Sequence, residues 1–393
     1  QNPCGFSDLT IEPITTITKP IARFTISPDS VACVNSTLTF TNSSIAGVAV
    51  DNFGVCDTTT KKNWVITPAT GWNIANGALG NSSPTNNPNT WGSNILGITF
   101  TTPGVYNISM IVRKDPCGND TIIKSVCIQS PPTPSFIATP LTGCSPLIVN
   151  FTNTSTGLNQ CGPITRLWTV TKTSFTCQAD STNDYVFISG TNSTSNNPVI
   201  RFNNQGTYSV TLQLTNKCGQ FTSVPTIISV KRKPILSITV APNPICLGQT
   251  VTPTASPLPC DTPIIAYSWT FNGGTPPSSN QQSPGPISYS SGGNKNITLT
   301  VQNACGSTTA NTSVLVNTPA TANAGPDIAV CINSGNVQLN GIPTSGTWSG
   351  TNVTSTGVFT PSQSGTFNLI YTVGTGNCLG VDTMVMTVNP LPI

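Results

Sequence analysis

The stretch GTYSVTLQLTNKCG, from Gly206 to Gly219, decides the fold of this chain. Its large apolar side chains occupy alternate positions: Tyr208, Val210, Leu212 and Leu214. A period of two is typical of a β-strand that buries one face and leaves the other in water. A polar turn, a cysteine and a glycine follow, as expected where a strand ends in a tight turn. The stretch therefore predicts an antiparallel strand with a cysteine in the hairpin behind it.

This strand and its hairpin recur three more times. The copies are GVYNISMIVRKDPCG at 104–118, GNKNITLTVQNACG at 293–306 and GTFNLIYTVGTGNCLG at 365–380. Each unit also has an earlier strand, at 36–42, 147–153, 249–256 or 336–341. A tryptophan segment lies between the two strands and starts near Asn63, Leu167, Tyr267 or Gly346. Short strands with turns about every 8–12 residues, and no amphipathic helix, predict an all-β chain of immunoglobulin-like sandwiches.

The hairpin cysteines set the size of each unit. They recur at intervals of roughly 70–115 residues, which is the size of one immunoglobulin-like sandwich. Proline-rich stretches separate the units and predict five parts: the final strand of a truncated repeat at 1–19, repeat 1 at 20–130, repeat 2 at 131–230, repeat 3 at 231–317 and repeat 4 at 318–393. Short, proline-stiffened linkers favour an end-to-end arrangement. With sandwiches of roughly 35–45 Å, the four repeats form a rod of about 150 Å.

Both ends of the sequence look like parts of the same pattern. QNPCGFSDLTIEPITTI at 1–17 matches a hairpin cysteine followed by a final strand, and VNPLPI at 388–393 matches an inter-repeat linker. We therefore expect the chain to be a segment of a longer array of repeats.

Charged residues are scarce. They make up 7% of the chain, against a usual level of about 25%, and the net charge is +3. Such a surface lacks the basic patch with which proteins bind nucleic acids or anionic membranes. No apolar run approaches the 18 or so residues that a membrane-spanning helix needs. We expect no nucleic-acid partner and no membrane insertion in this segment.

The residues needed for catalysis are also scarce. The sequence contains no histidine, which excludes Ser-His-Asp and Cys-His arrangements. The 12 acidic residues are scattered and lie mostly in predicted turns, whereas a carboxylate-dependent hydrolase needs two in one cleft. No Asp-x-Asp-x-Asp run favours calcium, and the absence of Cys-x-x-Cys and of histidine disfavours zinc. The sequence therefore predicts a protein that is not an enzyme and has no cofactor.

The 14 cysteines indicate disulfides and an oxidising compartment. Within one sandwich, the cysteine before the tryptophan segment and the hairpin cysteine lie at the same end. This predicts Cys56–Cys117, Cys161–Cys218 and Cys260–Cys305. Cysteines at the opposite end predict Cys33–Cys127 and Cys144–Cys177. Elimination pairs Cys331 with Cys378, and Cys4 and Cys246 remain unpaired.

Two segments of repeat 3 resemble the PKD domain, a family of immunoglobulin-like sandwiches. YSWTFNGGTPP at 267–277 keeps Trp269 and Phe271 of the family's W-x-F-G-D-G turn, although Asn272 and two glycines replace the rest of that turn. NITLTVQNACG at 296–306 is similar to the family's closing strand. Repeats 1 and 2 keep the strands and lose the turn. The resemblance implies PKD-type sandwiches, which also serve as spacers in secreted hydrolases.

Repeat 4 carries a different set of markers. AGPD at 324–327, GTWSG at 346–350 and GVFTP at 357–361 resemble a repeat of giant cell-surface proteins of Bacteroidota, including gliding-motility adhesins that the type IX system secretes. This resemblance implies O-glycosylation of the hydroxyl residue in Asp-Ser/Thr motifs. The acceptors would be Thr58, Thr121, Ser181 and Thr383.

Trp72 and Trp91 lie in the long insert of repeat 1. Exposed tryptophan rings are platforms for the apolar face of a sugar, so both are candidate carbohydrate contacts. In the alternative interpretation, the two side chains pin the insert against the sandwich.

These features together predict a structural stalk segment of a large adhesin or filament at the cell surface, attached to the outer membrane. Its role is to hold a distal adhesive part away from the cell, for attachment or gliding, and to contact an extracellular surface or polysaccharide through that part. An alternative is a set of spacer or carbohydrate-binding modules of a secreted polysaccharide-degrading enzyme. A third is a homopolymeric fibre, joined through an unpaired strand edge or through Cys246.

Overall fold

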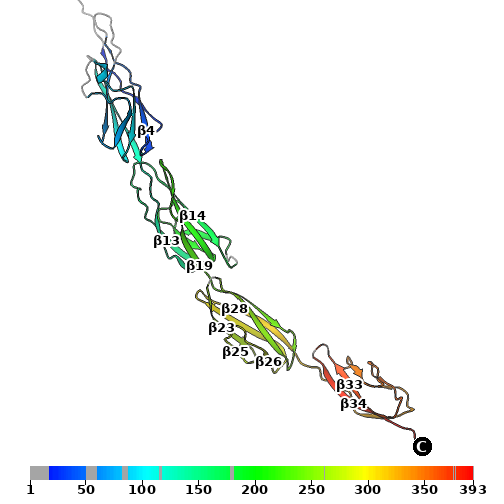
Figure 1. The fold of residues 1–393 in the computed structure, drawn as a ribbon. Coiled ribbons are helices and arrows are strands. Elements are labelled where there is room, and N and C mark those ends of the chain that lie inside the picture. The colour runs from blue at the N-terminus through cyan, green and yellow to red at the C-terminus, as the bar shows by residue number, and fades with distance from the viewer. Residues whose placement is uncertain are drawn as a thin grey trace, which may run out of the picture.

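The computed structural model is an elongated row of β-sandwiches that follow one another end to end (Figure 1). It describes residues 17–49, 60–81, 87–114, 117–177, 181–260, 262–374, 376 and 378–392. Within these ranges the only helical element is η1, a 3-10 turn at Pro88–Thr90. The predicted all-β fold of tandem immunoglobulin-like sandwiches is confirmed.

Repeat 1 pairs two four-stranded sheets of order β3-β10-β9-β6 and β2-β4-β8-β7. Its strands are β2 (Phe24–Ser27), β3 (Val31–Cys33), β4 (Thr37–Asn42), β6 (Lys61–Thr67), β7 (Trp72–Asn76), β8 (Ile95–Phe100), β9 (Gly104–Lys114) and β10 (Gly118–Gln129). A separate ribbon joins β1 (Ile17–Thr18) to β5 (Val48–Ala49).

Repeat 2 has a sheet of order β11-β13-β16-β15 and a second of order β12-β19-β17-β14, with β18 paired to β17. Its strands are β11 (Phe136–Thr139), β12 (Thr142–Cys144), β13 (Leu147–Asn153), β14 (Thr165–Ser174), β15 (Tyr185–Ile188), β16 (Val199–Phe202), β17 (Gly206–Asn216), β18 (Gly219–Thr222) and β19 (Thr226–Lys231).

Repeat 3 follows the same plan with sheets β20-β22-β26-β24 and β21-β28-β27-β23-β25. Its strands are β20 (Ile235–Ala241), β21 (Ile245–Cys246), β22 (Thr250–Leu258), β23 (Ile264–Phe271), β24 (Gly274–Thr275), β25 (Ser278–Ser279), β26 (Ile287–Tyr289), β27 (Gly293–Asn303) and β28 (Gly306–Asn317).

Repeat 4 is smaller, with a sheet of order β29-β34-β33-β31 and a two-stranded ribbon β30-β32. Its strands are β29 (Ile328–Cys331), β30 (Val337–Gln338), β31 (Thr347–Ser349), β32 (Val358–Phe359), β33 (Gly365–Val373) and β34 (Gly380–Asn389). The strand predicted over 336–341 is thus only two residues long. Glycines at 341 and 346 bring the chain directly onto the Tyr371 ring, since a Cβ atom at either position would lie 2.3–2.4 Å from that ring.

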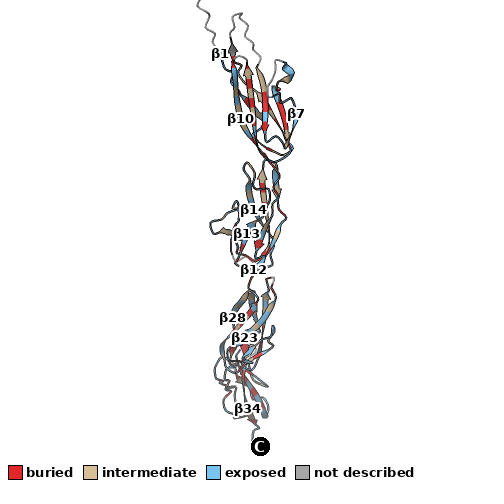
Figure 2. Cartoon of the chain, turned by 90° about the vertical axis from the view of Figure 1, so that its left-hand side faces the viewer, coloured by how far each residue is buried: buried red, intermediate tan, exposed pale blue. Residues whose placement is uncertain are grey.

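Each repeat has its own apolar core between its two sheets, visible as buried stripes along the strands (Figure 2). The alternation that predicts the fold is confirmed, because all four apolar residues of β17 are fully buried. The tryptophan segments supply one core indole per repeat: Trp64, Trp168, Trp269 and Trp348. Burying such a side chain stabilises a sandwich by about 1.5–3 kcal/mol or more, so each repeat has the core of an independent domain.

The order of the last strands decides which cysteines face which neighbour. The penultimate long strand of each repeat runs toward the preceding repeat and turns there, and the final strand runs back and ends at the linker to the next repeat. The turn needs glycine after the cysteine, since φ is +125° at Gly219 and +123° at Gly306. The hairpin cysteine therefore lies at the end of its sandwich that faces the preceding repeat.

Candidate functional site, the disulfide-bonded junctions

Every disulfide of the described residues joins two neighbouring repeats. The five bonds are Cys33–Cys218, Cys127–Cys161, Cys144–Cys305, Cys177–Cys260 and Cys246–Cys378. Their Cα atoms lie 4.9–5.5 Å apart, within the usual range of about 4.4–6.8 Å for disulfides. The bonds are therefore covalent links between domains, and the junctions are the distinctive sites of this molecule.

The first kind of link joins the early cysteine of one repeat to the hairpin cysteine of the next. It is formed by Cys33–Cys218, Cys144–Cys305 and Cys246–Cys378. A short parallel pairing with the final strand places each early cysteine: Cys33 lies opposite Gln129, Cys144 opposite Lys231 and Cys246 opposite Asn317. Since the final strand leads directly into the next repeat, the early cysteine meets the hairpin that projects back from that repeat.

The second kind of link uses the cysteine before the tryptophan strand of the following repeat. Cys127 in β10 bonds Cys161, and Cys177 after β14 bonds Cys260. The junctions between repeats 1 and 2 and between repeats 2 and 3 thus have two disulfides each. Among the described residues, the junction between repeats 3 and 4 has only Cys246–Cys378.

The pairings predicted within single repeats are wrong. Cys161–Cys218, Cys260–Cys305, Cys33–Cys127, Cys144–Cys177 and Cys331–Cys378 do not form, because each of these cysteines bonds a neighbouring repeat, except Cys331, which is free. Cys246, predicted to be unpaired, bonds Cys378. The predicted Cys56–Cys117 bond involves Cys56, which, like Cys4, lies outside the described residues, and Cys117 is a free buried thiol.

The physical reason is the closeness of adjoining ends. For repeats 1, 2 and 3 the prediction placed the cysteines at the correct ends of their sandwiches, but it treated each sandwich alone, whereas Cys331 and Cys378 were paired by elimination and lie at opposite ends of repeat 4. The linker between repeats 2 and 3 is short, since β19 ends at Lys231 and β20 begins at Ile235. Two sandwich ends joined so closely bring cysteines of different repeats to bonding distance.

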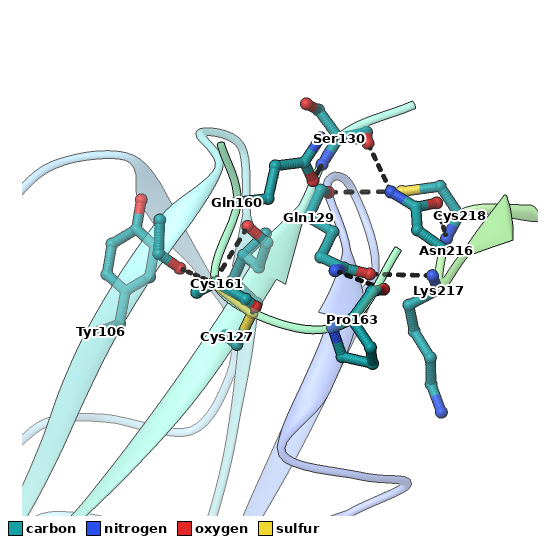
Figure 3. Close-up of a disulfide and its surroundings, with 12 residues drawn as sticks. Tyr106, Cys127, Gln129, Ser130, Gln160, Cys161, Pro163, Asn216, Lys217 and Cys218 are labelled. Atoms are coloured by element: carbon teal, nitrogen blue, oxygen red, sulfur yellow. Dashed lines mark hydrogen bonds between the residues drawn. A yellow bond between two sulfur atoms is a disulfide. The ribbon is translucent and has the colours of Figure 1, made fainter. Parts of the chain in front are cut away.

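Hydrogen bonds surround the disulfides at the first junction (Figure 3). Gln129 is fully buried there, and its Oε1 accepts from the backbone N–H of Lys217 at 2.8 Å. Gln160 and the backbone of Ser130 exchange two hydrogen bonds, at 2.8 and 3.0 Å. Asn216 donates from Nδ2 to the Ser130 carbonyl at 2.8 Å. Side chains of repeat 2 thus satisfy backbone groups of the linker, which orients the two repeats.

The second junction repeats part of this arrangement. Asn303 is 1% exposed and donates from Nδ2 to the carbonyl of Arg232, at 2.9 Å. Its Oδ1 accepts from the backbone N–H of Cys305 at 2.8 Å, as the Asn216 Oδ1 does from Cys218 at 2.9 Å. The hairpin asparagine therefore orients the cysteine and binds the linker. Sequence reasoning missed this role, although Asn-x-Cys-Gly recurs at 2–5, 216–219 and 303–306.

An ion pair also crosses the first junction. Lys217 Nζ lies 2.9 Å from Asp29 Oδ2, and both side chains are about half exposed, at 48% and 47%. The hydrogen bond from Lys217 holds the pKa of Asp29 below its usual value. An exposed pair of this kind adds little stability but favours one relative orientation of the two repeats.

The junction between repeats 3 and 4 is more open. A cleft of about 1330 Å³ lies there, lined in part by Cys246, Gln249, Asn317 and Cys378. Clefts at the first and second junctions measure about 300 and 440 Å³. The cleft beside Cys246–Cys378 is thus larger than the clefts at the first two junctions.

Two of the predicted glycosylation motifs have aspartates with a structural role. Asp120 Oδ2 accepts from the backbone N–H of Ala22, and Asp382 Oδ2 accepts from that of Ala324, both at 2.7 Å. Each carboxylate therefore holds the incoming linker of its repeat. The neighbouring Thr121 and Thr383 are exposed on the final strands.

The other two predicted acceptors are placed differently. Ser181 is partly buried, and its backbone N–H donates to Asn204 Oδ1 at 2.8 Å. Thr58 lies outside the described residues.

The two candidate sugar contacts lie in different settings. Trp72 packs against the core of repeat 1, and its indole Nε1 donates to the Pro68 carbonyl at 2.9 Å. Trp91 follows η1 and is partly exposed, and its backbone N–H donates to the Pro88 carbonyl at 3.1 Å. Trp72 therefore has the packing expected of a residue that pins the insert.

The described part of the chain holds no group of three or more Cys, Asp or Glu side chains arranged to bind a metal ion. In the same residues, no helix is long and apolar enough to cross a membrane. Five disulfides are typical of secreted and extracellular proteins, because the cytosol keeps thiols reduced.

A comparison with family models matches repeat 3. Residues 235–316 match the PKD domain. The match covers the segments whose resemblance to that family the sequence shows. It begins with β20 and ends one residue before the end of β28. A comparison with curated proteins finds none that matches the chain.

A comparison with solved structures finds partial similarity to a fragment of titin, to immunoglobulin domains of a cell adhesion molecule and to a bacterial adhesin. An I-band fragment of titin is 14% identical, with a TM-score of 0.41 over 76% of this chain and 98% of that one. The N-terminal eight Ig domains of Down syndrome cell adhesion molecule are 13% identical, with a TM-score of 0.33 over 94% of this chain and 49% of that one. FdeC, an Escherichia coli adhesin, is 12% identical, with a TM-score of 0.29 over 77% of this chain and 96% of that one. At this level of similarity none of them indicates what the chain binds.

Proposed function

We propose that this chain is a structural stalk segment of a large extracellular adhesin or filament, and that its work is to transmit tension along a row of repeats. The observation that carries the proposal is the placement of the disulfides across the junctions. A bond within a domain protects that domain, whereas a bond between domains joins the two mechanically.

The covalent path between the two ends supports this role. From residue 1, a pulling force follows the backbone to Cys33, crosses to Cys218, continues to Cys246, crosses to Cys378 and reaches residue 393. That path contains about 75 residues, which span about 260 Å when fully extended. The folded row is already about 150 Å long on the strand spacing of its sandwiches. The oxidised chain can therefore lengthen less than twofold, even if every repeat unfolds.

Strand direction supports the same role. The long strands of the repeats run along the row, as β14, β28 and β33 show (Figure 1). Tension along the row therefore shears many ladder hydrogen bonds together.

The cellular setting is part of the proposal. The markers of repeat 4 at 324–327, 346–350 and 357–361 favour a surface protein of Bacteroidota that the type IX system secretes and that is attached to the outer membrane. In that setting, the stalk holds a distal adhesive part that contacts an extracellular surface or polysaccharide during attachment or gliding. The chain itself is not an enzyme in this proposal, because its sequence has no histidine and its acidic residues are scattered.

Glycosylation of Thr121 and Thr383 belongs to the same proposal. Both side chains are exposed on final strands, and both follow an aspartate that is held by a linker hydrogen bond. Peptides that contain these residues, isolated from native material, should carry a glycan by mass spectrometry. Unmodified Thr121 and Thr383 in that material would refute the assignment.

The alternative role as an enzyme's spacer or carbohydrate-binding module receives less support. A carbohydrate-binding module needs exposed indole rings on which a sugar can stack. Trp72 instead packs on the core of repeat 1, and its indole Nε1 donates to the Pro68 carbonyl. One measurement separates the two roles: the mass and flanking sequence of the native polypeptide sheared from intact cells. Many further repeats and a sorting domain support the stalk, and a neighbouring domain with a histidine or carboxylate active site would overturn it.

A further inference from the structure

Among the described residues, two cysteines of the repeating pattern have no disulfide partner, Cys117 and Cys331, and the backbone surroundings of Cys331 match those of the bonded cysteines. Cys331 is an exposed free thiol at the end of β29, opposite Asn389 of β34. The other three early cysteines occupy the same register beside the last residue of a final strand, and all three are bonded: Cys33, Cys144 and Cys246.

The backbone beside these cysteines is also the same. In each repeat, the residue after the early cysteine donates its N–H to the carbonyl of the residue opposite that cysteine. These bonds measure 2.8 Å at Val34, 2.7 Å at Ser145, 2.9 Å at Leu247 and 3.0 Å at Ile332. Repeat 4 therefore presents the same cysteine geometry at its far end as repeats 1, 2 and 3.

The order of the bonds gives a second, independent indication. The disulfides of the first kind form two interleaved covalent lines. One line enters at Cys33, crosses to Cys218, follows the backbone to Cys246 and crosses to Cys378. The other crosses from Cys144 to Cys305 and follows the backbone to Cys331. The stretch from Cys305 to Cys331 is nearly as long as the stretch from Cys218 to Cys246, after which the first line crosses again.

We propose that the end of repeat 4 formed by Cys331 and Asn389 is a docking face for a further immunoglobulin-like repeat joined after Asn389, whose hairpin cysteine bonds Cys331. The inference rests on the disulfide-joined array proposed above. Bond formation removes one hydrogen from each of the two thiols, and the two electrons and two protons reduce a disulfide oxidant, such as oxidised glutathione, to two thiols.

The hairpin that fits this face has the sequence features of the three that already bond. A glycine follows the cysteine directly at 218 and 305, and after one further residue at 378. The early cysteine is presented by its own turn, since the backbone N–H of Cys331 donates to Ser334 Oγ at 3.2 Å, as that of Cys246 does to Gln249 Oε1 at 2.9 Å. The partner is thus an immunoglobulin-like sandwich that carries such a hairpin. A small-molecule thiol is not the expected partner, because it has no hairpin to pack against this face.

The test is an extended chain in which residues 1–389 are followed by a second copy of 318–393. In this chain Asn389 is followed directly by Thr318 of the added copy, just as Asn317 precedes Thr318 in the native sequence. At that native junction Cys378 bonds Cys246. In the added copy, the exposed Leu379 is replaced (Leu379→Val) so that its hairpin peptide has its own mass. After oxidation with a glutathione redox mixture, we expect a Cys331–Cys378 peptide between the first and the added copy under non-reducing digestion.

Two controls keep the result interpretable. Cys331→Ser in the first copy should leave the added hairpin cysteine open to alkylation, and the retained Cys246–Cys378 peptide reports that the array is folded. If both thiols are alkylated while that peptide is intact, the proposal is wrong. A dimer of the original chain through Cys331 would also overturn it, because the partner would then be a second molecule. Both results concern only whether Cys331 bonds an added repeat. The stalk proposal is tested separately by the mass and flanking sequence of the native polypeptide, so the two proposals can fail independently.

Discussion

Removing the Cys246–Cys378 bond should more than double the length to which the chain can be pulled. With the bond intact, the shortest covalent path through the disulfides of the described residues holds about 75 residues, or about 260 Å. In the double variant Cys246→Ser/Cys378→Ser, the shortest path runs from Cys218 back along the backbone to Cys144 and crosses to Cys305. This route holds about 194 residues, which extend to about 700 Å. Complete reduction frees the whole chain, at about 1,300 Å.

The assay is single-molecule force spectroscopy on the full chain, tethered at residues 1 and 393. The wild-type protein should stop lengthening at about 260 Å without reductant, and with dithiothreitol it should reach the length of the fully reduced chain. If the pairs expected within single repeats formed instead, the shortest path would hold about 148 residues and reach about 500 Å. An oxidised chain that extends to this intermediate length would refute the junction bonds. A double variant that still stops at the wild-type length would refute the path through Cys246.

Two further predictions concern individual side chains. Asn303→Ala should lower the free energy of unfolding of repeat 3 by about 1–3 kcal/mol, because the buried amide donates to the Arg232 carbonyl. Chemical denaturation measures this loss. The control is Asn294→Ala at an exposed position of the same strand, which should be nearly neutral. Burial raises the pKa of Asp184, but hydrogen bonds that include the one from Lys172 outweigh burial and lower it overall. A lowered carboxyl pKa contributes stability that is present above the unfolded value, about 4, and is lost as pH falls through the folded value. Asp184→Asn should therefore lower the melting temperature at pH 7, and this effect should shrink as pH falls below about 4. A loss that stays equal at pH 7 and at acidic pH would show that the charge is not responsible.

The fold was predictable because the burial of one strand face requires apolar residues at alternate positions, and this pattern can be read within a short stretch of sequence. The alternation at 206–219 specifies which side chains of β17 face the core, and the same pattern in three other stretches specifies the number of sandwiches. Strand lengths in repeat 4 were less predictable, because the packing of Tyr371 on glycine positions depends on residues distant in sequence.

The junctions were not predictable from that local pattern. A period of two identifies the buried face of a strand but not what lies beyond the end of the sandwich. One clue was nevertheless present: pairing within repeats leaves Cys246 without a partner, which is the sign that bonds leave the repeat. The hairpin asparagine was a second clue, since a buried Asn303 needs carbonyl partners that its own hairpin does not supply.

The overlapping disulfides also determine what happens when the backbone is cut. Cys33–Cys218, Cys144–Cys305 and Cys246–Cys378 together enclose every peptide bond from Cys33 to Cys378. A protease that nicks any single loop in that range leaves the two fragments covalently attached, so the molecule keeps its connection after damage that would sever an ordinary string of domains. Outside the cell, where cut chains are not repaired, the working lifetime of such a molecule is set by the second cut rather than the first.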